Sequence, residues 1–306
     1  MKIMVFDVGG TEIKYSVMDE QMHRTDSGAV PTPQDTQAQF LDTVYRLYAP
    51  YKDEVTGIAM ALPGFVDNRT GYVSNGGALL YNTATPVGQL LAEKCGCPVI
   101  LENDGKAAAM AELANGALKD CCNAAVFIIG TGVGGGIIAN GQLVRGVHFT
   151  AGEYSFVNTN AEAWDAPDQN MACQCSTKNL LKWYRARKAL PENAPLDGRS
   201  FFAAANAGEP EALEVLRRFC HAVAVQIFNL TVLLDVEKVA IGGGISKQPL
   251  LLESLRSAYD GLYASRAGQA YMEGLPRCQI VPCAFSSEAN QVGVAAAYFE
   301  AMQKKC

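Results

Sequence analysis

This sequence of 306 residues has no long apolar run, no surplus of positive charge and only three histidines. Each of these features argues against a class of function. No apolar run approaches the roughly 18 uninterrupted residues that a membrane-spanning helix requires. The formal net charge of −6 argues against partners such as nucleic acid or an anionic membrane. Hydrophobic residues at 49% and charged residues at 18% are instead typical of a globular protein.

The sequence also lacks a secretory signal, a disulfide framework and a regular zinc motif. Met1 leads directly into an apolar run, without a basic segment or a cleavage site. The ten cysteines lie in apolar surroundings, which is typical of buried thiols in a reducing compartment, so we expect a cytoplasmic protein. Cys173 and Cys175 form only a Cys-x-Cys pair, and the three histidines offer few further ligands, so we expect no structural zinc.

The order of the predicted elements indicates an α/β fold made of two related lobes. A strand, a glycine turn and a second strand are predicted over residues 3–18, and the pattern restarts at residue 124. We predict a small lobe at 1–117, onto which the last helix packs back, and a large lobe at 118–288. Other strands are predicted over 55–62, 98–101, 238–241 and 279–282. Helices are predicted over 40–48, 89–94, 105–115, 180–188, 200–206, 209–234, 250–263 and 289–304.

The first glycine turn, Asp7-Val-Gly-Gly-Thr11, predicts a phosphate contact. Gly9 and Gly10 lack side chains, so their amides can approach a phosphate closely. Thr11 adds a hydroxyl group, Lys14 can neutralise phosphate charge, and Asp7 can hold Mg²⁺ through water. An ordinary hairpin explains this short motif equally well.

The second glycine turn, Gly130–Gly136, contains five glycines in seven residues, followed by a strand predicted from Ile137. Glycine weakens strands, so we favour close approach to a phosphate or nucleotide, through Gly130, Thr131 and Gly132, over a role in packing. The turn lacks the lysine of a Walker loop, and no helix follows it as in a dinucleotide fingerprint. Asn140-Gly141 then predicts a hairpin. A third glycine cluster consists of Gly242, Gly243 and Gly244. It can bind adenine and ribose against its backbone, or it can be a plain turn before a helix.

Asp104 follows a predicted strand and precedes an alanine-rich helix. A carboxylate at a strand end, among loops able to hold polyphosphate, predicts transfer of a phosphoryl group to a hydroxyl whose proton the aspartate accepts. The positive end of the helix dipole would keep Asp104 ionised. The simpler interpretation is that Asp104 only caps the helix. Asn103 and Glu153 are candidate partners of sugar hydroxyls, with Gly76 and Gly77 lining the same pocket, although Glu153 is also typical of a solvated loop.

These motifs together resemble the ROK family (repressors, open reading frames and sugar kinases) within the actin-like ATPase fold. The resemblance extends from Lys2 to the last helix. It rests on Asp7-x-Gly-Gly-Thr11, Glu102-Asn-Asp104, Gly130-Thr-Gly-x-Gly-Gly-Gly136, Ala151-Gly-Glu153 and Gly242-Gly-Gly244.

The resemblance implies a duplicated, ribonuclease H-like fold with a cleft between two lobes, and an ATP- and Mg²⁺-dependent sugar kinase. Asp104 would be the base, and the acceptor would be O6 of glucose or of a β-glucoside such as cellobiose. N-acetylmannosamine kinase, fructokinase and a non-catalytic sugar-binding protein are the alternatives. The family's repressors carry a DNA-binding domain ahead of the first strand, which here follows Met1 directly, so we expect no nucleic acid partner. A homodimer is common among relatives.

One segment departs from the family pattern. The family usually follows Gly-Glu with x-Gly-His, whose histidine binds sugar and zinc, whereas Tyr154, Ser155 and Phe156 occupy these positions here. The family's β-glucoside kinases are similar in lacking zinc and in carrying an aromatic residue at this place. Phe156 is therefore predicted to stack on a second sugar ring.

Overall fold

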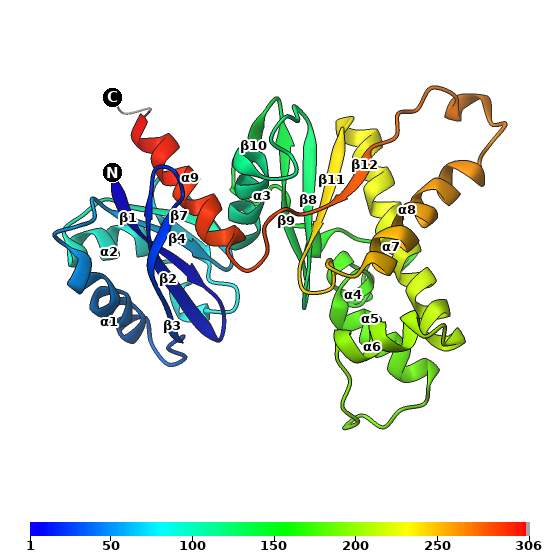
Figure 1. Cartoon of the computed structure of the whole chain (residues 1–306), viewed down its shortest axis with the longest axis horizontal. Helices are drawn as coiled ribbons and strands as arrows, with labels where there is room; N and C mark the ends of the chain where they lie inside the picture. The colour runs from blue at the N-terminus through cyan, green and yellow to red at the C-terminus, as the bar shows by residue number, and fades with distance from the viewer. Residues whose placement is uncertain (304–306) are drawn as a thin grey trace. The chain divides into compact units, whose positions relative to one another are not determined.

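The computed structural model describes residues 1–303, except for the side chain of Tyr271, and divides into two compact units (Figure 1). Unit 1 comprises Met1–Gly116, Leu143–Ala151 and the described residues from Ser287 onward. Unit 2 comprises Ala117–Gln142 and Gly152–Ser286. Two segments distant in the sequence therefore complete the N-terminal unit.

Unit 1 is built on a five-stranded sheet in the order β3 (Arg24–Pro31), β2 (Glu12–Asp19), β1 (Lys2–Val8), β4 (Ile58–Leu62) and β7 (Val99–Asn103). Strands β1, β2 and β3 pair antiparallel, and β1, β4 and β7 pair parallel. Every residue of β4 is buried, as expected for a central parallel strand covered on both faces. The short hairpin β5 (Phe65–Asp67) and β6 (Tyr72–Asn75) follows β4.

The helices of unit 1 cover both faces of this sheet. Helices α1 (Gln37–Tyr48) and α2 (Val87–Cys95) share a hydrophobic core with Met4, Phe6 and Val8 on one face of β1. Residues alternate along a strand, so Ile3 and Val5 are buried on the opposite face. Helix α9 (Ala289–Gln303) packs against strands β1 and β4 and lies along α3 (Asp104–Asn115). The short 3-10 helices are η1 (Ala49–Tyr51) and η2 (Leu80–Asn82).

The second five-stranded sheet has the order β10 (Gln142–Val144), β9 (Val133–Ala139), β8 (Ala124–Ile129), β11 (Lys238–Gly242) and β12 (Gln279–Pro282). Strands β8, β9, β11 and β12 belong to unit 2, and only Gln142 of β10 does. Counted along the chain within each sheet, the third, second, first, fourth and fifth strands are neighbours in both. Strand β8 pairs antiparallel with β9 and parallel with β11, which pairs parallel with β12. This repetition is the duplication that the two glycine turns predict.

The helices of unit 2 form its core together with the sheet. They are α4 (Met171–Gln174), α5 (Thr177–Arg187), α6 (Gly198–Asn206), α7 (Pro210–Leu234) and α8 (Pro249–Ala264). Phe127, Phe201, Phe202 and Phe219 are fully or almost fully buried among them. The 3-10 helices of this unit are η3 (Tyr154–Phe156), η4 (Ala161–Ala163) and η5 (Ala270–Met272).

The structure corrects the predicted extent of the second glycine turn. Strand β9 begins at Val133 rather than at Ile137, so three of the five glycines lie inside the β8–β9 ladder. Gly135 has a φ of 140°, and a side chain there would overlap the Val126 carbonyl oxygen and approach the Tyr154 ring. Packing therefore explains Gly135, which the sequence pattern attributed to ligand contact, because the Tyr154 ring lies against the strand backbone there.

Other predicted boundaries also shift. Strand β3 was not predicted, and β4 begins at Ile58 rather than at Val55. The Asn140-Gly141 hairpin is confirmed, with φ values of 54° and 70° that suit a tight turn. Helix α9 is described to Gln303, and the last residue of its predicted span, Lys304, lies outside the described residues.

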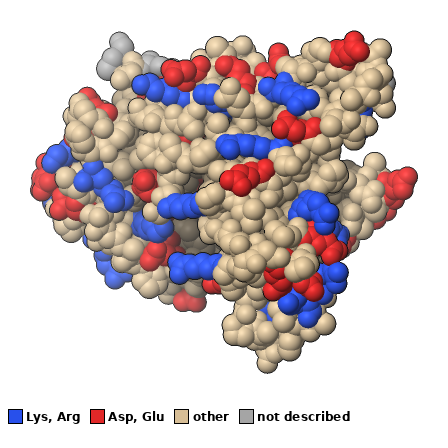
Figure 2. Space-filling view, turned by 45° about the vertical axis from the view of Figure 1, so that its right-hand side comes forward, with Lys and Arg blue, Asp and Glu red and all other residues tan. Residues whose placement is uncertain are grey.

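Among the described residues, no helix has both the length and the apolar character that crossing a membrane would need. On the face drawn in Figure 2, basic and acidic side chains lie side by side over the surface.

Candidate active site

Asp104 is the first residue of α3 in unit 1, directly after strand β7. The N-cap of this helix is Asn103, whose Oδ1 accepts a hydrogen bond from the Lys106 amide at 3.0 Å. The interpretation of Asp104 as a simple cap is therefore wrong. Its Oδ1 accepts hydrogen bonds from the Gly105 amide at 2.7 Å and from Asn103 Nδ2 at 3.0 Å. Strand end, helix start and neighbouring amide together fix the orientation of this carboxylate.

Asn103 also connects the end of β7 to the loop that follows β4. Its Nδ2 donates a second hydrogen bond, to the Gly64 carbonyl at 2.9 Å. An amide group has two N–H donors, so both are used inside the protein. Asn103 can therefore meet a substrate hydroxyl only as an acceptor, through Oδ1, while these bonds persist.

The structure brings Gly76 and Gly77 next to Gly64. A side chain on Gly64 would overlap the Asn75 carbonyl oxygen and lie 2.7 Å from the Gly77 amide nitrogen. The turn itself is held by hydrogen bonds from the Gly76 amide to Thr83 Oγ1 at 3.0 Å and from the Gly77 amide to Asn75 Oδ1 at 2.8 Å. Since the Gly64 carbonyl binds Asn103, this turn and the end of β7 form one bonded cluster.

Glu102 and Arg145 form an ion pair behind this cluster, with Glu102 Oε2 at 2.8 Å from Arg145 Nε. Glu102 is completely buried, and its Oε1 accepts a hydrogen bond from the Asn103 amide at 3.0 Å. Burial raises the pKa of the Glu102 carboxyl, while the Arg145 charge and hydrogen bond oppose that shift. Arg145 was not predicted as a site residue, because no local sequence pattern connects it with residue 102.

The first glycine turn joins β1 to β2 in unit 1. Asp7 and Lys14 lie opposite each other across these strands, and Asp7 Oδ1 accepts a hydrogen bond from Asn290 Nδ2 of α9 at 2.8 Å. Burial raises the pKa of Asp7, although Asn290 and Lys14 act in the opposite direction. The Gly9 and Gly10 carbonyls accept hydrogen bonds, each of 2.8 Å, from the side chains of Thr32 and Gln34, and Thr11 is exposed.

The second glycine turn, Gly130 to Gly132, joins β8 to β9 in unit 2. Its Gly130 carbonyl accepts a hydrogen bond from the Thr177 amide at the start of α5, at 2.9 Å. A side chain on Gly132 would lie 3.0 Å from Ser155 Oγ, so the turn is adjacent to η3. Ser155 Oγ in turn bonds the amide and the carbonyl of Val133, each at 3.1 Å.

Glu153 precedes η3, whose position is set by a buried tyrosine. The Tyr154 hydroxyl donates a hydrogen bond to the Gly136 carbonyl at 3.0 Å. Its ring packs edge-on against the Phe127 ring, with the two ring centres 4.6 Å apart. Phe156, two residues further on, is 70% exposed. The segment therefore buries its first aromatic ring and exposes its second.

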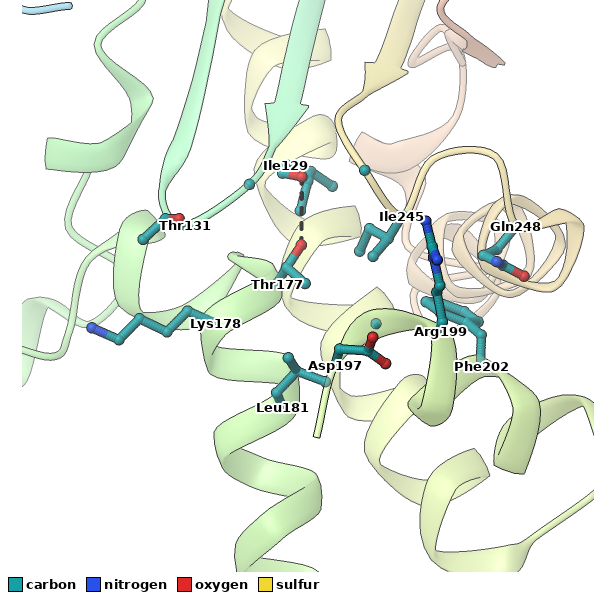
Figure 3. A pocket seen from close by; sticks show the side chains of 13 residues that line it. Ile129, Thr131, Thr177, Lys178, Leu181, Asp197, Arg199, Phe202, Ile245 and Gln248 are labelled. Carbon is teal, nitrogen blue, oxygen red and sulfur yellow. Dashed lines mark hydrogen bonds between the residues drawn. The ribbon is translucent and has the colours of Figure 1, made fainter. Parts of the chain in front are cut away.

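The end of β8 opens into a pocket of about 720 Å³ in unit 2 (Figure 3). Four elements contribute its lining: the second glycine turn, the starts of α5 and α6, and the loop between β11 and α8. This volume is in the range of pockets that hold small ligands. The lining residues include Gly130, Thr131, Thr177, Lys178, Asp197, Arg199, Phe202, Gly244, Ile245 and Gln248.

Charged side chains lie on different sides of this pocket. In Figure 3, Lys178 extends on the side of Thr131, whereas Arg199 stands beside Ile245 and Gln248. Asp197 is the N-cap of α6, and hydrogen bonds from the amide and the side chain of Ser200 lower the pKa of its carboxyl. The pocket therefore offers two cations and one anion to a polar ligand.

The three glycines after β11 have different environments. Gly244 lines the pocket and has open space where a side chain would be. Gly243, with a φ of 95°, has no room for a side chain, which would overlap the Ile129 carbonyl oxygen. Gly242 faces Ile128 and Cys283, so neither of these two glycines is among the lining residues.

A family model described as the ROK family matches residues 3–303. The chain belongs to the ROK family. The β-glucoside kinase of Listeria innocua is 30% identical over 258 residues, which cover 84% of this chain and 87% of that protein. The N-acetyl-D-glucosamine kinase of Vibrio atlanticus is 31% identical over 277 residues, which cover 82% and 86%.

A solved structure of a ROK family glucokinase from Streptomyces griseus, in complex with glucose and AMPPNP, has the same fold. The TM-score is 0.79 at 25% identity, and the match covers 97% of this chain and 99% of that chain. The actin-like ATPase fold that the resemblance implied is thereby confirmed for this ROK chain.

In this ROK protein, most side chains that line the pocket were not predicted from the sequence. Lys178 lies in the first turn of α5, and Asp197 and Arg199 lie at the start of α6. The only local signals near them are the N-cap residues Ser176 and Asp197, and such residues begin helices whether or not a ligand binds there. The two thiols of the Cys-x-Cys pair have different environments. Cys175 is part of the buried core, whereas Cys173 Sγ lies 3.7 Å from the Pro167 carbonyl oxygen.

Proposed function

We propose that this ROK protein is an ATP-dependent sugar kinase in which Asp104 accepts a proton from the acceptor hydroxyl. The observation that carries the proposal is the Asp104 carboxylate, held at the end of β7 by Asn103 and Gly105 while Asn103 serves as the helix cap. An aspartate that does not cap its helix but is fixed by two hydrogen bonds is suited to proton transfer.

The reaction requires few steps of covalent chemistry. The acceptor oxygen attacks the γ-phosphorus of ATP, its proton passes to Asp104, and the bond from the γ-phosphorus to the oxygen of ADP breaks. Asn103 Oδ1 would accept a hydrogen bond from a neighbouring sugar hydroxyl, because its amide hydrogens are already used. Gly76 and Gly77 would border the same hydroxyls, and Glu153 would accept hydrogen bonds from a vicinal pair.

The pocket of unit 2 would hold the nucleoside against Gly244, and the amides of Thr131 and Gly132 would hold phosphates beside Lys178, whereas the Gly130 amide already donates to the Gly132 carbonyl at 3.0 Å. In unit 1, the Gly10 amide, the Thr11 hydroxyl and Lys14 would hold phosphate, whereas the Gly9 amide closes the turn by donating to the Glu12 carbonyl at 2.9 Å. The AMPPNP complex of the S. griseus glucokinase supports ATP as the donor.

Asp7 is suited to hold Mg²⁺ through water. Its carboxylate has one oxygen bonded to Asn290, and Lys14 lies across the strand pair. Oxygen ligands and bound water are what Mg²⁺ prefers, and the ion would neutralise charge on the transferring phosphoryl group. In unit 2, Gly242 and Gly243 would support the nucleoside pocket through packing rather than through direct contact with the nucleoside.

For the acceptor, we propose O6 of glucose or of a β-glucoside such as cellobiose. The exposed ring of Phe156 and the relative named β-glucoside kinase favour the disaccharide. The N-acetyl-D-glucosamine kinase relative makes amino sugars the second class of acceptor. The cytoplasmic location, the homodimer and the lack of structural zinc stay predictions. Light scattering of the purified protein tests the homodimer, and metal analysis tests for zinc.

The deciding experiment is a coupled assay of ADP release with ATP and Mg²⁺ over hexoses, amino sugars and β-glucosides. Sugar-dependent release of ADP is expected, with cellobiose giving a higher kcat/KM than glucose. A lack of sugar-dependent release with every acceptor would exclude a kinase acting on these classes, and binding of a sugar without turnover would favour a non-catalytic sugar-binding protein. A higher value for glucose would remove the proposed role of Phe156.

A further inference from the structure

The buried ion pair between Glu102 and Arg145 is not used by the chemistry proposed above. Glu102 is on β7 and completely buried, whereas Arg145 is in the segment Leu143–Ala151, which belongs to unit 1. The side chain of Arg145 is 26% exposed, and its second guanidinium nitrogen lies 3.3 Å from Met110 Sδ on α3. One arginine thus contacts both the strand and the helix that flank Asp104.

A continuous set of hydrogen bonds leads from this pair to the proposed base. Glu102 uses Oε2 to accept from Arg145 at 2.8 Å and Oε1 to accept from the Asn103 amide at 3.0 Å. Asn103 then donates from Nδ2 to Asp104 Oδ1 at 3.0 Å. Glu102 uses one carboxylate oxygen for each of these two partners, so a rotation of its carboxylate would release the Asn103 backbone amide.

The charge on Arg145 keeps Glu102 in the form that makes both bonds. Burial raises the pKa of the Glu102 carboxyl, and the charges of Arg145 and Lys106 oppose this effect. Without Arg145, the buried carboxylate would have to take up a proton or move toward water. Protonation would weaken the acceptor that holds the Asn103 backbone amide, and movement would take it away from Asn103.

We propose that Arg145 is a positioning residue for Asp104, acting through Glu102 and Asn103. This inference rests on the proposed kinase function. Arg145 itself touches neither acceptor nor donor. It holds the last residues of β7 so that the Asp104 carboxylate meets the acceptor hydroxyl at the correct distance and angle. A displacement of about 1 Å at a reacting group can cost about 100-fold in rate.

A simpler role for Arg145 would be to fasten the segment Leu143–Ala151 to unit 1. The chain provides a matched control for that role, because Arg69 also binds this segment. Its guanidinium carbon lies 4.6 Å from the centre of the Phe149 ring, and among the described contacts of Arg69 none involves Glu102. Arg69→Met should loosen the segment and leave Glu102 in place.

The test compares wild-type protein with Arg145→Met, Arg145→Lys and Arg69→Met in the ADP-release assay, after each variant is shown by thermal melting to be folded. We expect Arg145→Met to lower kcat by about 100-fold with the KM for ATP changed by less than about twofold, because the nucleotide pocket is in unit 2. Arg145→Lys, which keeps the charge, should recover about tenfold, and Arg69→Met should stay within about threefold of wild type.

Arg145→Met leaves a buried charge and can reduce folding, so the double variant Arg145→Met with Glu102→Gln provides a second measurement. It carries no unpaired buried charge and should melt closer to wild type than the single variant. Its kcat should still be at least about tenfold below wild type, because residue 102 has lost its anchor. A double variant with wild-type kcat, or an Arg69→Met defect as large as that of Arg145→Met, would overturn the positioning role. Wild-type protein without sugar-dependent turnover would instead reject the kinase function itself.

Discussion

In unit 1 the buried Asn103 and the half-buried Asp104, both proposed to act on the acceptor, are hydrogen-bonded to each other, whereas in unit 2 the residues proposed to bind the donor line an open pocket. Asn103 uses both amide hydrogens and one lone pair inside the protein, and Asp104 is held by two hydrogen bonds. Lys178, Arg199 and Asp197 instead border about 720 Å³ of space. The same strand order therefore supports two kinds of site.

This difference separates chemistry from binding. A group that transfers a proton must be fixed before the substrate arrives, since small displacements are costly. A pocket for a nucleoside must exchange its ligand in every cycle, so its charges face solvent. Substitutions in the unit 1 cluster should therefore lower kcat, and substitutions in the unit 2 pocket should raise the KM for ATP.

The largest expected effect comes from Asp104→Asn. The amide oxygen of asparagine can still accept from Gly105 and Asn103, so the geometry is kept and only the basicity is lost. We expect kcat to fall by about 1,000-fold, with the affinity for ATP unchanged, as measured by ADP release and by calorimetry. A variant that retains near-normal kcat would show that another group accepts the proton.

A second, smaller effect separates the glycines of unit 2. Gly243→Ala places a methyl group against the Ile129 carbonyl and strains a residue with a φ of 95°, so we expect a loss of about 3 kcal/mol in the free energy of unfolding. Gly244→Ala has open space and should change that free energy by less than about 0.5 kcal/mol. Urea unfolding measures both.

The same pair distinguishes packing from ligand contact. Since Gly244 lines the pocket, its alanine variant should raise the KM for ATP severalfold without loss of stability. Equal stability for the two variants would mean that the backbone at Gly243 relaxes. An unchanged KM in Gly244→Ala would mean that the nucleoside lies elsewhere.

Much of the fold could be predicted because its signals are local. The strand–glycine–strand pattern at Gly9-Gly10 and again at Gly130 marks the duplication, and Asn140-Gly141 marks the hairpin. The error at Gly134–Gly136 has a physical reason. A glycine that meets a ligand and a glycine that meets an aromatic ring look alike in a sequence, and Tyr154, which covers Gly135, lies about 20 residues away.

The candidate site could be predicted only where one motif carries it. Asp104 and Asn103 are adjacent, so their strand end was visible in the sequence, but the exchange of roles between cap and base was not. Arg145, Asn290 and Lys178 come from distant segments, and their partners follow from tertiary packing. A lone polar or charged residue in a sequence is usually exposed to solvent, so no local signal selects Arg145, Asn290 or Lys178.

Lys178→Met tests whether the charge in the unit 2 pocket binds phosphate. Losing one charged hydrogen bond of about 1.5 kcal/mol should raise the KM for ATP about tenfold, with kcat changed by less than about twofold. Lys182→Met is the matched control, because Lys182 is on the same helix, exposed and outside the pocket. An equal change in both variants would indicate a general effect of net charge.

The smallest expected effect concerns Phe156. If its ring stacks on the second sugar of a β-glucoside, Phe156→Ala should lower the kcat/KM for cellobiose relative to glucose by about threefold, which corresponds to a stacking energy of roughly 0.7 kcal/mol. Trp164 is 73% exposed in the same unit and provides a control of equal accessibility. Since exposed aromatic rings can bind sugars without selectivity, only a shift in the ratio that is absent from Trp164→Ala would assign the disaccharide contact to Phe156. An equal shift in both variants would make the contact nonspecific, and the proposed acceptor contacts would then be Glu153 and the hydrogen-bonded residues of unit 1.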